Sequence, residues 1–278
     1  MKFRKKKTAA AKRLLALSAA FALACLIYSF IEPYMLKETA TVIRDSDIPD
    51  AFAGKRIAFV SDFHLDAFSS PERIAQIVRR INAAGPDIII LGGDYVTDDK
   101  KYLKPCFEEL ARLEAPLGVY GVTGNHDSVA DYGLTVRYMR EAGIVPLENE
   151  ARDIWIGGEK IRLGGVKTSY GKISDAEPAT DGTRQNDFVI LVSHNPDFAE
   201  DLRTDRIDLM LSGHTHGGQV TLFGLWAPYV PSGYGQKYLK KYQTVNGTPV
   251  LVSNGVGTSA LPVRFFAQPE YDVITLEK

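Results

Sequence analysis

The five histidines of this chain occupy positions where they could bind metal. Two of them stand two residues apart in "LMLSGHTHGGQV", directly after an apolar run. The same placement recurs along the chain, because each histidine lies at the end of a short apolar run: His64, His126, His194, His214 and His216. A single histidine there is usually a solvated loop residue. The recurrence at every histidine favours one shared site, since imidazole is the commonest metal ligand in proteins.

Oxygen ligands accompany the histidines at the ends of these runs. "RIAFVSDFH" contains Asp62, "DIIILGGD" ends at Asp94, and "LGVYGVTGNHD" contains Asn125. Two aspartates, an asparagine and four histidines form a set without thiolate, which suits Mn, Fe, Zn or Co and disfavours a structural zinc site of the cysteine type. The set is too large for one ion and about right for two ions that share a carboxylate. Such metal pairs are typical of displacement at phosphorus.

Strands and helices must bring these distant residues together. "SSPERIAQIVRRINAAGP" places its isoleucines and Val78 on one face of a helix that begins after Ser70, and a second helical pattern spans residues 102–113. Continuous apolar strands that alternate with helices predict an α/β fold with a sheet covered on both faces. Sites in such sheets form beyond the carboxyl ends of the strands. The last stretch, "EYDVITLEK", predicts a final edge strand.

The N-terminal region reads as a membrane segment. Residues 1–13 are basic, residues 14–31 ("LLALSAAFALACLIYSFI") are uncharged, and residues 32–54 read as a linker before a domain at 55–278. A cleaved signal peptide is the alternative, because "ALA" precedes Cys25. Cleavage there would leave "CLIYSFI" exposed, so we favour an uncleaved single-pass anchor in the cell membrane. The positive-inside rule then places the domain outside the cytoplasm.

Charge excludes one class of partner. Seven basic residues and no acidic ones lie within residues 1–31, and the formal net charge is −1, so the remaining chain carries −8. An acidic body argues against broad capture of nucleic acid, which needs a basic face. A small phosphate-bearing substrate remains compatible with it. The two cysteines, Cys25 and Cys106, give no reason to expect an intramolecular disulfide.

The ordered motifs "DFH", "GGDYVTD", "GNHD", "SHNPD" and "GHTHGGQ" resemble those of the calcineurin-like metallophosphoesterases. Residues 57–278 are most similar to the membrane-anchored bacterial branch that includes UDP-2,3-diacylglucosamine hydrolase-like proteins. The resemblance implies a four-layer sandwich of two β-sheets flanked by helices. It also implies two divalent ions, held by Asp62, His64 and His216 on one side and by Asn125, His194 and His214 on the other, with Asp94 bridging.

The resemblance implies a separate catalytic role for His126. This residue would not bind metal but would stabilise the transition state or protonate the leaving oxygen, with Asp127 orienting its ring. The chain departs from the phosphoprotein phosphatases of the family, because "YVTDDKK" follows Asp94 where they carry an arginine. We therefore expect a phosphodiester or pyrophosphate substrate, which could be lipid-linked. The alternatives are a UDP-2,3-diacylglucosamine-type lipid pyrophosphate and a catalytically silent, metal-stabilised membrane scaffold.

The C-terminal third suggests contacts with substrate. "GGQVTLFGLWAPYVPSGYGQKYLKKY" is rich in aromatic residues and lysines, and Phe223 and Trp226 stand close after the last histidine. This segment is either a loop that packs its aromatic side chains on the core, or a substrate-binding lip or bilayer-contacting surface. Arg264 is either a donor to a substrate phosphate or a member of a surface ion pair.

Overall fold

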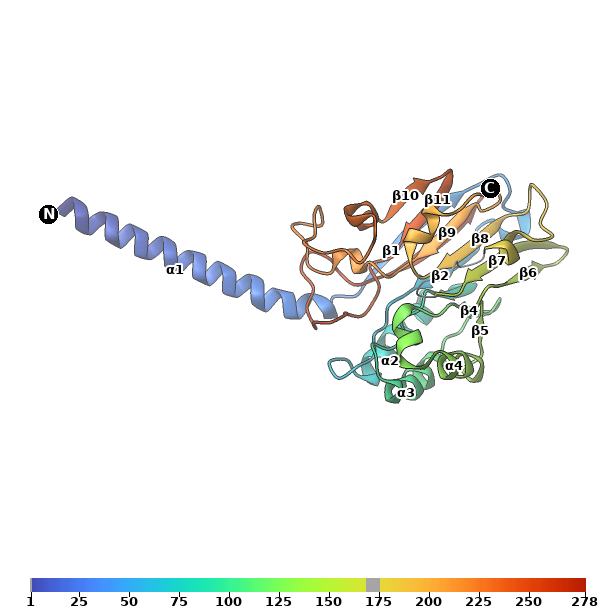
Figure 1. The fold of residues 1–278 in the computed structure, drawn as a ribbon, viewed down its shortest axis with the longest axis horizontal. Helices are drawn as coiled ribbons and strands as arrows, with labels where there is room; N and C mark the ends of the chain where they lie inside the picture. Colours follow the sequence, from blue (N-terminus) through green and yellow to red (C-terminus); the bar gives the residue numbers. More distant parts are fainter. Residues whose placement is uncertain (1, 169–175) are drawn as a thin grey trace.

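Two six-stranded β-sheets form the centre of the molecule (Figure 1). The computed structural model describes residues 2–168 and 176–278. In sheet order, the first sheet contains β1 (Lys37–Arg44), β12 (Glu270–Glu277), β2 (Arg56–Val60), β3 (Ile88–Leu91), β4 (Val119–Gly121) and β5 (Ile144–Pro146). The second contains β10 (Tyr242–Val245), β11 (Thr248–Val252), β9 (Leu209–Ser212), β8 (Val189–Ser193), β7 (Glu159–Val166) and β6 (Glu150–Ile156). Both sheets mix parallel and antiparallel pairs.

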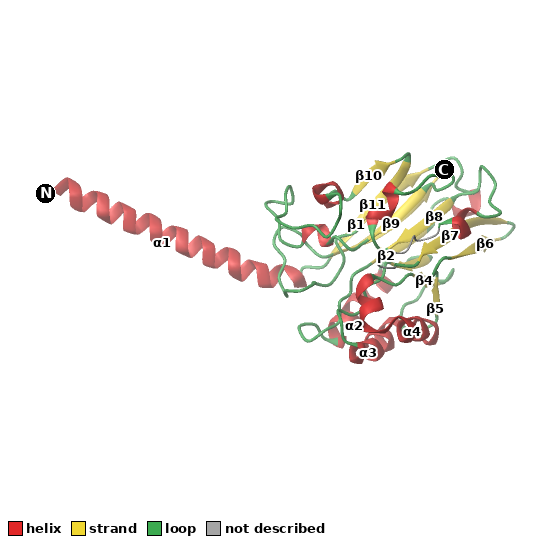
Figure 2. Cartoon of the chain, viewed as in Figure 1, coloured by secondary structure: helices red, strands yellow, loops and turns green. Residues whose placement is uncertain are grey.

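Helices cover the outer faces of both sheets (Figure 2). The first sheet carries α2 (Pro71–Ala83), α3 (Leu103–Leu110) and α4 (Asn125–Glu141). The second carries α5 (Glu177–Thr180) and the 3-10 helices η4 (Pro196–Glu200) and η6 (Gly235–Leu239). The remaining 3-10 helices are η1 (Glu32–Tyr34), η2 (Asp50–Phe52), η3 (Lys100–Tyr102) and η5 (His216–Gly218). This arrangement confirms the predicted four-layer sandwich.

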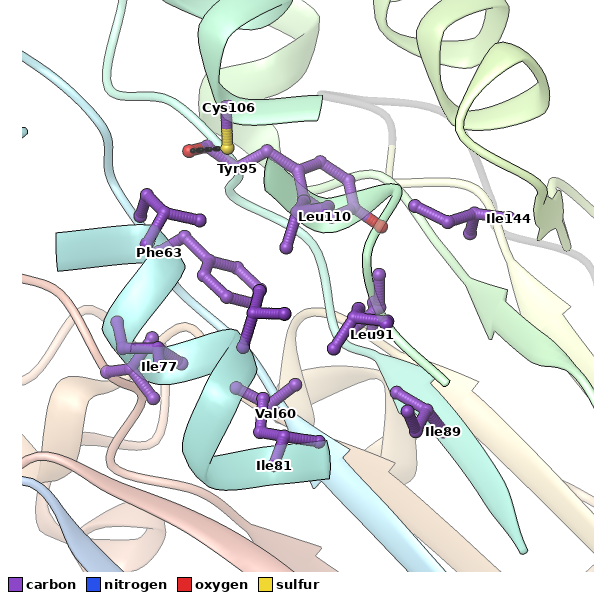
Figure 3. Close-up of a cluster of buried hydrophobic side chains, with 14 of the residues drawn as sticks. Val60, Phe63, Ile77, Ile81, Ile89, Leu91, Tyr95, Cys106, Leu110 and Ile144 are labelled. Atoms are coloured by element: carbon purple, nitrogen blue, oxygen red, sulfur yellow. Dashed lines mark hydrogen bonds between the residues drawn. The ribbon is translucent and has the colours of Figure 1, made fainter. Parts of the chain in front are cut away.

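The strands are apolar throughout because both of their faces are buried. In β2, Ile57 and Phe59 point into the core between the two sheets, where they join side chains of β8 and β9. The intervening Ala58 and Val60 point to the other face and pack under α2 and α3. Figure 3 shows this outer cluster, with Val60 close to side chains of α2. Burial on alternate faces explains why the sequence shows unbroken apolar runs where a half-exposed strand would alternate with polar residues.

The structure differs from the sequence interpretation at one edge of the first sheet, in the edge strand β1 and in its neighbour β12. Residues 32–54, read as a linker, contain η1, η2 and the strand β1, which pairs in parallel with β12. The segment 270–277, expected at a sheet edge, therefore lies between β1 and β2. Only Ile43 of β1 is buried, so the strand lacks the continuous apolar pattern that would have revealed it.

Helix α1 (Lys2–Ile31) projects from the domain as a single long rod (Figure 1). The segment Ala11–Tyr34, which comprises most of α1 and the short helix η1, has a mean hydropathy of 2.3 and is only 6% buried against the rest of the chain. Length and composition are sufficient for it to cross a membrane.

We predict that β1 contributes to the stability of the domain. Ile43 is 7% exposed and packs between the sheets, whereas its neighbour Val42 is 43% exposed on the opposite face. Ile43→Ala should lower the free energy of unfolding by about 2–3 kcal/mol, because it removes buried side-chain volume. The control Val42→Ala should change it by less than about 0.5 kcal/mol. Urea unfolding of the full chain in detergent measures both, and equal effects would contradict an integral role for β1.

Candidate active site

The polar residues predicted at the ends of five strands converge on one centre. Strands β2, β3 and β4 of the first sheet and β8 and β9 of the second all direct their carboxyl ends to it. The chain segments that follow these strands carry all of the predicted ligand residues: Asp62, His64, Asp94, Asn125, His194, His214 and His216. His126 lies beside them, with its ring centroid 4.8 Å from that of His64. The two halves of the chain thus complete one site between the sheets.

Asp94 lies at the middle of this centre. Its Oδ2 atom is 3.0 Å from Nε2 of His194 and 3.6 Å from Nε2 of His64. Ligand atoms of Asp94, His194 and His214 lie within 4.8 Å of one another and could hold one ion.

A second cluster adjoins the first. Ligand atoms of Asp62, His64 and His216 satisfy the same distance limit. Oδ1 of Asp62 lies 3.5 Å from Nε2 of His216 and 3.9 Å from Nε2 of His64. Asp94 belongs to the first cluster and also approaches His64 of the second. Its carboxylate therefore lies between the two clusters, in the position of a bridging ligand.

Unpaired buried acceptors show that the centre fits a cation. Four buried atoms that face it have no hydrogen-bond partner: Nε2 of His64, Oδ2 of Asp94, Oδ1 of Asn125 and Nε2 of His194. The Nδ1 atom of His194 lies 2.7 Å from the carbonyl oxygen of Gly92 and donates to it. Nε2 of the neutral ring then presents its lone pair to Asp94. Two acceptors 3.0 Å apart in a buried site need a cation or a proton between them.

The electrostatics of the buried residues favour metal ligands. Burial lowers the pKa of His64 to about 3 and that of His214 to about 3, so both imidazoles are neutral and their lone pairs are available. Burial also opposes the charged form of His194, but the Asp94 carboxylate outweighs it and raises the pKa of His194 to about 10. A proton therefore takes the position between His194 and Asp94 when no ion is there, and a metal ion must displace it.

Left-handed backbone aims the ligands at the centre. Positive φ angles occur at Asp62 (59°), His64 (47°), Asp94 (53°), His214 (68°) and His216 (52°). Residues other than glycine rarely adopt this conformation, and it concentrates at functional sites where the surrounding structure supports the strain. Close packing adds to the constraint, because a Cβ atom at Gly124 would clash with Oδ1 of Asp94.

Asp127 does not orient the ring of His126. Its carboxylate accepts hydrogen bonds from the backbone N–H groups of Asp94 (2.8 Å), Tyr95 (2.9 Å) and Gly124 (2.8 Å). These bonds tie the loop after β3 to the start of α4, so Asp127 positions Asp94 and acts on the backbone.

Asp98 contacts the ring that Asp127 was expected to orient. Nδ1 of His126 lies 2.7 Å from the carbonyl oxygen of Thr97 and 3.0 Å from Oδ1 of Asp98. The sequence does not predict this role for Asp98, because a contact between its carboxylate and the ring of His126 arises only from the folding of two loops. The proximity of Asp98 to Asp94 in the sequence was the only available signal.

Arg264 is neither a phosphate donor at the surface nor a member of a surface ion pair. The side chain is fully buried and donates to the backbone carbonyl groups of Asn254 (2.7 Å), Gly257 (2.7 Å) and Ala267 (2.7 Å). Its Nη2 atom lies 3.4 Å from Nδ1 of His216. Arg264 therefore organises the loops behind His216, and burial lowers the pKa of its guanidinium to about 10.

A cavity of about 840 Å³ opens beside the metal-type centre. Its lining includes the polar residues Asp94, Asn125 and His126 and apolar residues such as Val220 and Leu261. Phe223 and Trp226, expected to bind substrate, are not among the residues that line it. Both are exposed, at 66% and 52%, and lie outside the cavity.

Two adjoining clusters of ligand-type residues, which meet where Asp94 approaches His64 beside a cavity at the carboxyl ends of strands, define a metal-dependent phosphoester hydrolase. The chain belongs to the calcineurin-like phosphoesterase family, whose model matches residues 55–218. It is 32% identical over 253 residues to the metallophosphoesterase YkuE of Bacillus subtilis, an alignment that covers 89% of this chain and 88% of the relative.

Other relatives extend this similarity. A metallophosphoesterase of Aquifex aeolicus is 30% identical over 258 residues, covering 90% of this chain and 95% of the relative. A transmembrane protein with a metallophosphoesterase domain from Danio rerio is 27% identical over 249 residues, covering 83% of this chain and 55% of that protein.

We predict that Asp98 supports His126 without contributing to metal binding. Asp98→Asn keeps the shape of the side chain but removes the charge beside Nδ1, so kcat should fall by roughly 10-fold, a fraction of the usual contribution of a positioned acid or base. KM and metal content should stay unchanged. The control Asp99→Asn alters the neighbouring carboxylate, which caps η3, and should leave kcat unchanged. Loss of metal from the Asp98 variant, measured by elemental analysis, would contradict this role.

Proposed function

We propose that this protein is a dimetal phosphoesterase that hydrolyses phosphodiesters or pyrophosphates. One ion would be held by Asp62, His64 and His216 and the other by Asn125, His194 and His214, with Asp94 as the shared ligand. The observation that carries the proposal is the position of the Asp94 carboxylate, whose Oδ2 atom is unpaired, between the unpaired Nε2 atoms of His64 and His194 in two adjoining clusters of ligand-type residues. Mn, Fe, Zn and Co all suit this mixed nitrogen and oxygen set.

Hydrogen bonds within the chain orient the proposed bridging ligand Asp94 and the proposed acid His126. When bound, the metal pair would lower the pKa of a water molecule and neutralise charge on the phosphoryl oxygens. The backbone N–H of His126 donates to Oδ1 of Asp94 (2.9 Å), which fixes the carboxylate. The Nδ1 contacts of His126 leave its Nε2 atom available to the cavity. The carboxylates of Asp94 and Asp98 raise the pKa of His126 against the effect of burial, which favours a proton on this ring for the leaving oxygen.

The cavity favours a diester over a phosphate monoester. No lysine or arginine occurs among the described residues that line it. A monoester dianion carries one more negative charge than a diester and would gain more from a cationic side chain there. The absence of an arginine in "YVTDDKK" after Asp94 points the same way.

Apolar residues in the lining of the cavity favour a second candidate substrate. Val220, Leu261 and Val263 could accept a lipid portion next to the phosphate, as in a pyrophosphate of the UDP-2,3-diacylglucosamine type. A cytoplasmic nucleotide-lipid conflicts with the orientation proposed below, so we rank it second. A catalytically silent scaffold is the alternative of another class. The complete ligand set together with His126 supports an enzyme.

We further propose that residues 14–31 anchor the protein in the cell membrane as a single span. The basic residues 1–13 would remain in the cytoplasm, and the domain at 55–278 would lie outside it. The exposed apolar surface of α1 and the existence of a transmembrane relative support the anchor.

Metal analysis and a panel of substrates test the proposed function. The full chain in detergent should contain two ions and hydrolyse an aryl phosphodiester faster than an aryl monoester, with a nucleotide-lipid pyrophosphate as the third substrate. His126→Ala should retain both ions while its rate falls by roughly 10²–10⁴-fold. Asp94→Ala serves as the metal-depleted control. Faster hydrolysis of the monoester would contradict the diester preference, and the absence of metal-dependent turnover would favour the scaffold.

A further inference from the structure

Six exposed apolar side chains form a patch beside the cavity, which we name the apolar rim. Its members come from two loops and are Leu222, Phe223, Leu225, Trp226, Leu261 and Phe266. The two loops are joined by the N–H of Thr221, which donates to the carbonyl of Phe265 (2.8 Å), and by contact between the rings of Phe223 and Phe266 (4.9 Å). Leu225 is 82% exposed. Apolar side chains gathered in this way at a surface mark an interaction site.

The rim is fixed to the end of α1. The backbone N–H of Arg264 donates to the carbonyl oxygen of Ser29 (2.9 Å). The ring of Tyr28 lies 5.8 Å from that of Phe265 and 5.9 Å from that of Phe266. The buried carboxylate of Glu32 accepts the N–H groups of Phe266 (2.7 Å) and Ala267 (2.9 Å). Figure 1 shows the loops of the C-terminal third on both sides of the point where α1 meets the domain.

These contacts set the depth of the rim relative to the apolar part of α1. At about 1.5 Å per residue the uncharged run 14–31 extends about 27 Å, which is slightly less than the ~30 Å thickness of a bilayer core. The whole run, up to Ile31, is therefore needed to cross the membrane. Ser29 and Tyr28 lie within one helical turn of Ile31, so the loop that is hydrogen-bonded to Ser29 and contacts the ring of Tyr28 reaches the same level. A loop at that level meets lipid, because it contacts α1 at Ser29, before the end of the helix at Ile31.

We propose that the apolar rim inserts into the lipid leaflet at which α1 ends and holds the domain with its cavity open toward the membrane surface. This inference rests on the proposed anchor. The rim then acts as a second membrane contact beside the single helix and restricts rotation of the domain about it. Val220 and Leu261 line the cavity and lie in the loops of the rim, so one wall of the cavity continues into the membrane-facing surface. Phosphoesters carried at the membrane surface would have the shortest path to the site.

The two tryptophans of the chain form a matched pair of probes. Trp226 belongs to the rim and is 52% exposed, and Trp155 in β6 is 55% exposed. Figure 1 shows β6 at the end of the domain opposite to α1. Trp155→Phe leaves only the rim tryptophan, and Trp226→Phe leaves only the distant one.

The experiment places each full-length variant in vesicles of phosphatidylcholine and phosphatidylglycerol and measures quenching of tryptophan fluorescence. A lipid carrying a nitroxide near its headgroup quenches from within the leaflet, and iodide quenches from water. We expect Trp226 to be quenched by the nitroxide lipid and shielded from iodide, and Trp155 to show the reverse. Adding Leu222→Ser and Leu225→Ser to the Trp226 reporter should reduce the lipid quenching while the protein still floats with the vesicles.

Three results would overturn the proposal. Equal quenching of both tryptophans by iodide, in protein that floats with the vesicles, would place the rim in water. Shielding of Trp226 from iodide without lipid quenching would show that a protein surface, such as a second copy of this chain, covers the rim. Failure of the protein to float with vesicles would remove the anchor and the rim contact together. None of these readouts depends on turnover, so they leave the proposed hydrolytic function separately testable.

Discussion

The structure depends on a repulsion that only a cation or a proton can relieve. Oδ2 of Asp94 and Nε2 of His194 face each other at 3.0 Å without access to water, and further unpaired acceptors surround them. Burial of such groups costs free energy unless a cation compensates. The left-handed backbone at five ligand positions adds strain of about 1–3 kcal/mol each. This centre therefore destabilises the folded state, and packing in the surrounding four-layer scaffold must offset its free-energy cost.

The scaffold meets this demand through strands that are buried on both faces. Ile57 and Phe59 fix β2 from the inner side, and Ala58 and Val60 fix it from the outer side, so the residues that follow the strand have little freedom. Hydrogen bonds between side chains and the backbone then connect the loops to one another. The carboxylate of Asp127, for example, accepts backbone N–H groups of the loop after β3 and of the start of α4. Ligands from distant parts of the sequence are thus held in place before any ion binds.

The ends of the strands and the types of ligand could be predicted from the sequence, because both depend on the local pattern of residues. Unbroken apolar runs identified β2, β3, β8 and β9, and the polar residues after them could be assigned from the rule that carboxyl ends of strands share an edge. The strand β1 could not be predicted, because it contributes a single buried side chain, Ile43, and pairs with a strand more than two hundred residues later.

Contacts between loops also could not be predicted from the local pattern of the sequence. Nothing near Asp98 in the sequence shows that its carboxylate reaches Nδ1 of His126. The sequence predicts Arg264 to be a phosphate donor or a member of a surface ion pair, because arginine is rarely buried without partners that the sequence does not show. In the structure its many carbonyl partners compensate the burial. The same residue donates its backbone N–H to Ser29, so the loops behind His216 also contact the base of α1. Such long-range pairings follow from tertiary packing alone.

The central claim is that the Asp94 carboxylate joins two ions, and electron paramagnetic resonance of the manganese-loaded protein tests it most directly. The full chain, stripped of metal and titrated with Mn²⁺, should bind two ions per chain and develop the multiline spectrum of a spin-coupled pair. Asp94→Ala should abolish that signal, because the shared ligand is lost. Binding of a single ion, or a spectrum of isolated Mn²⁺ at full occupancy, would contradict the account.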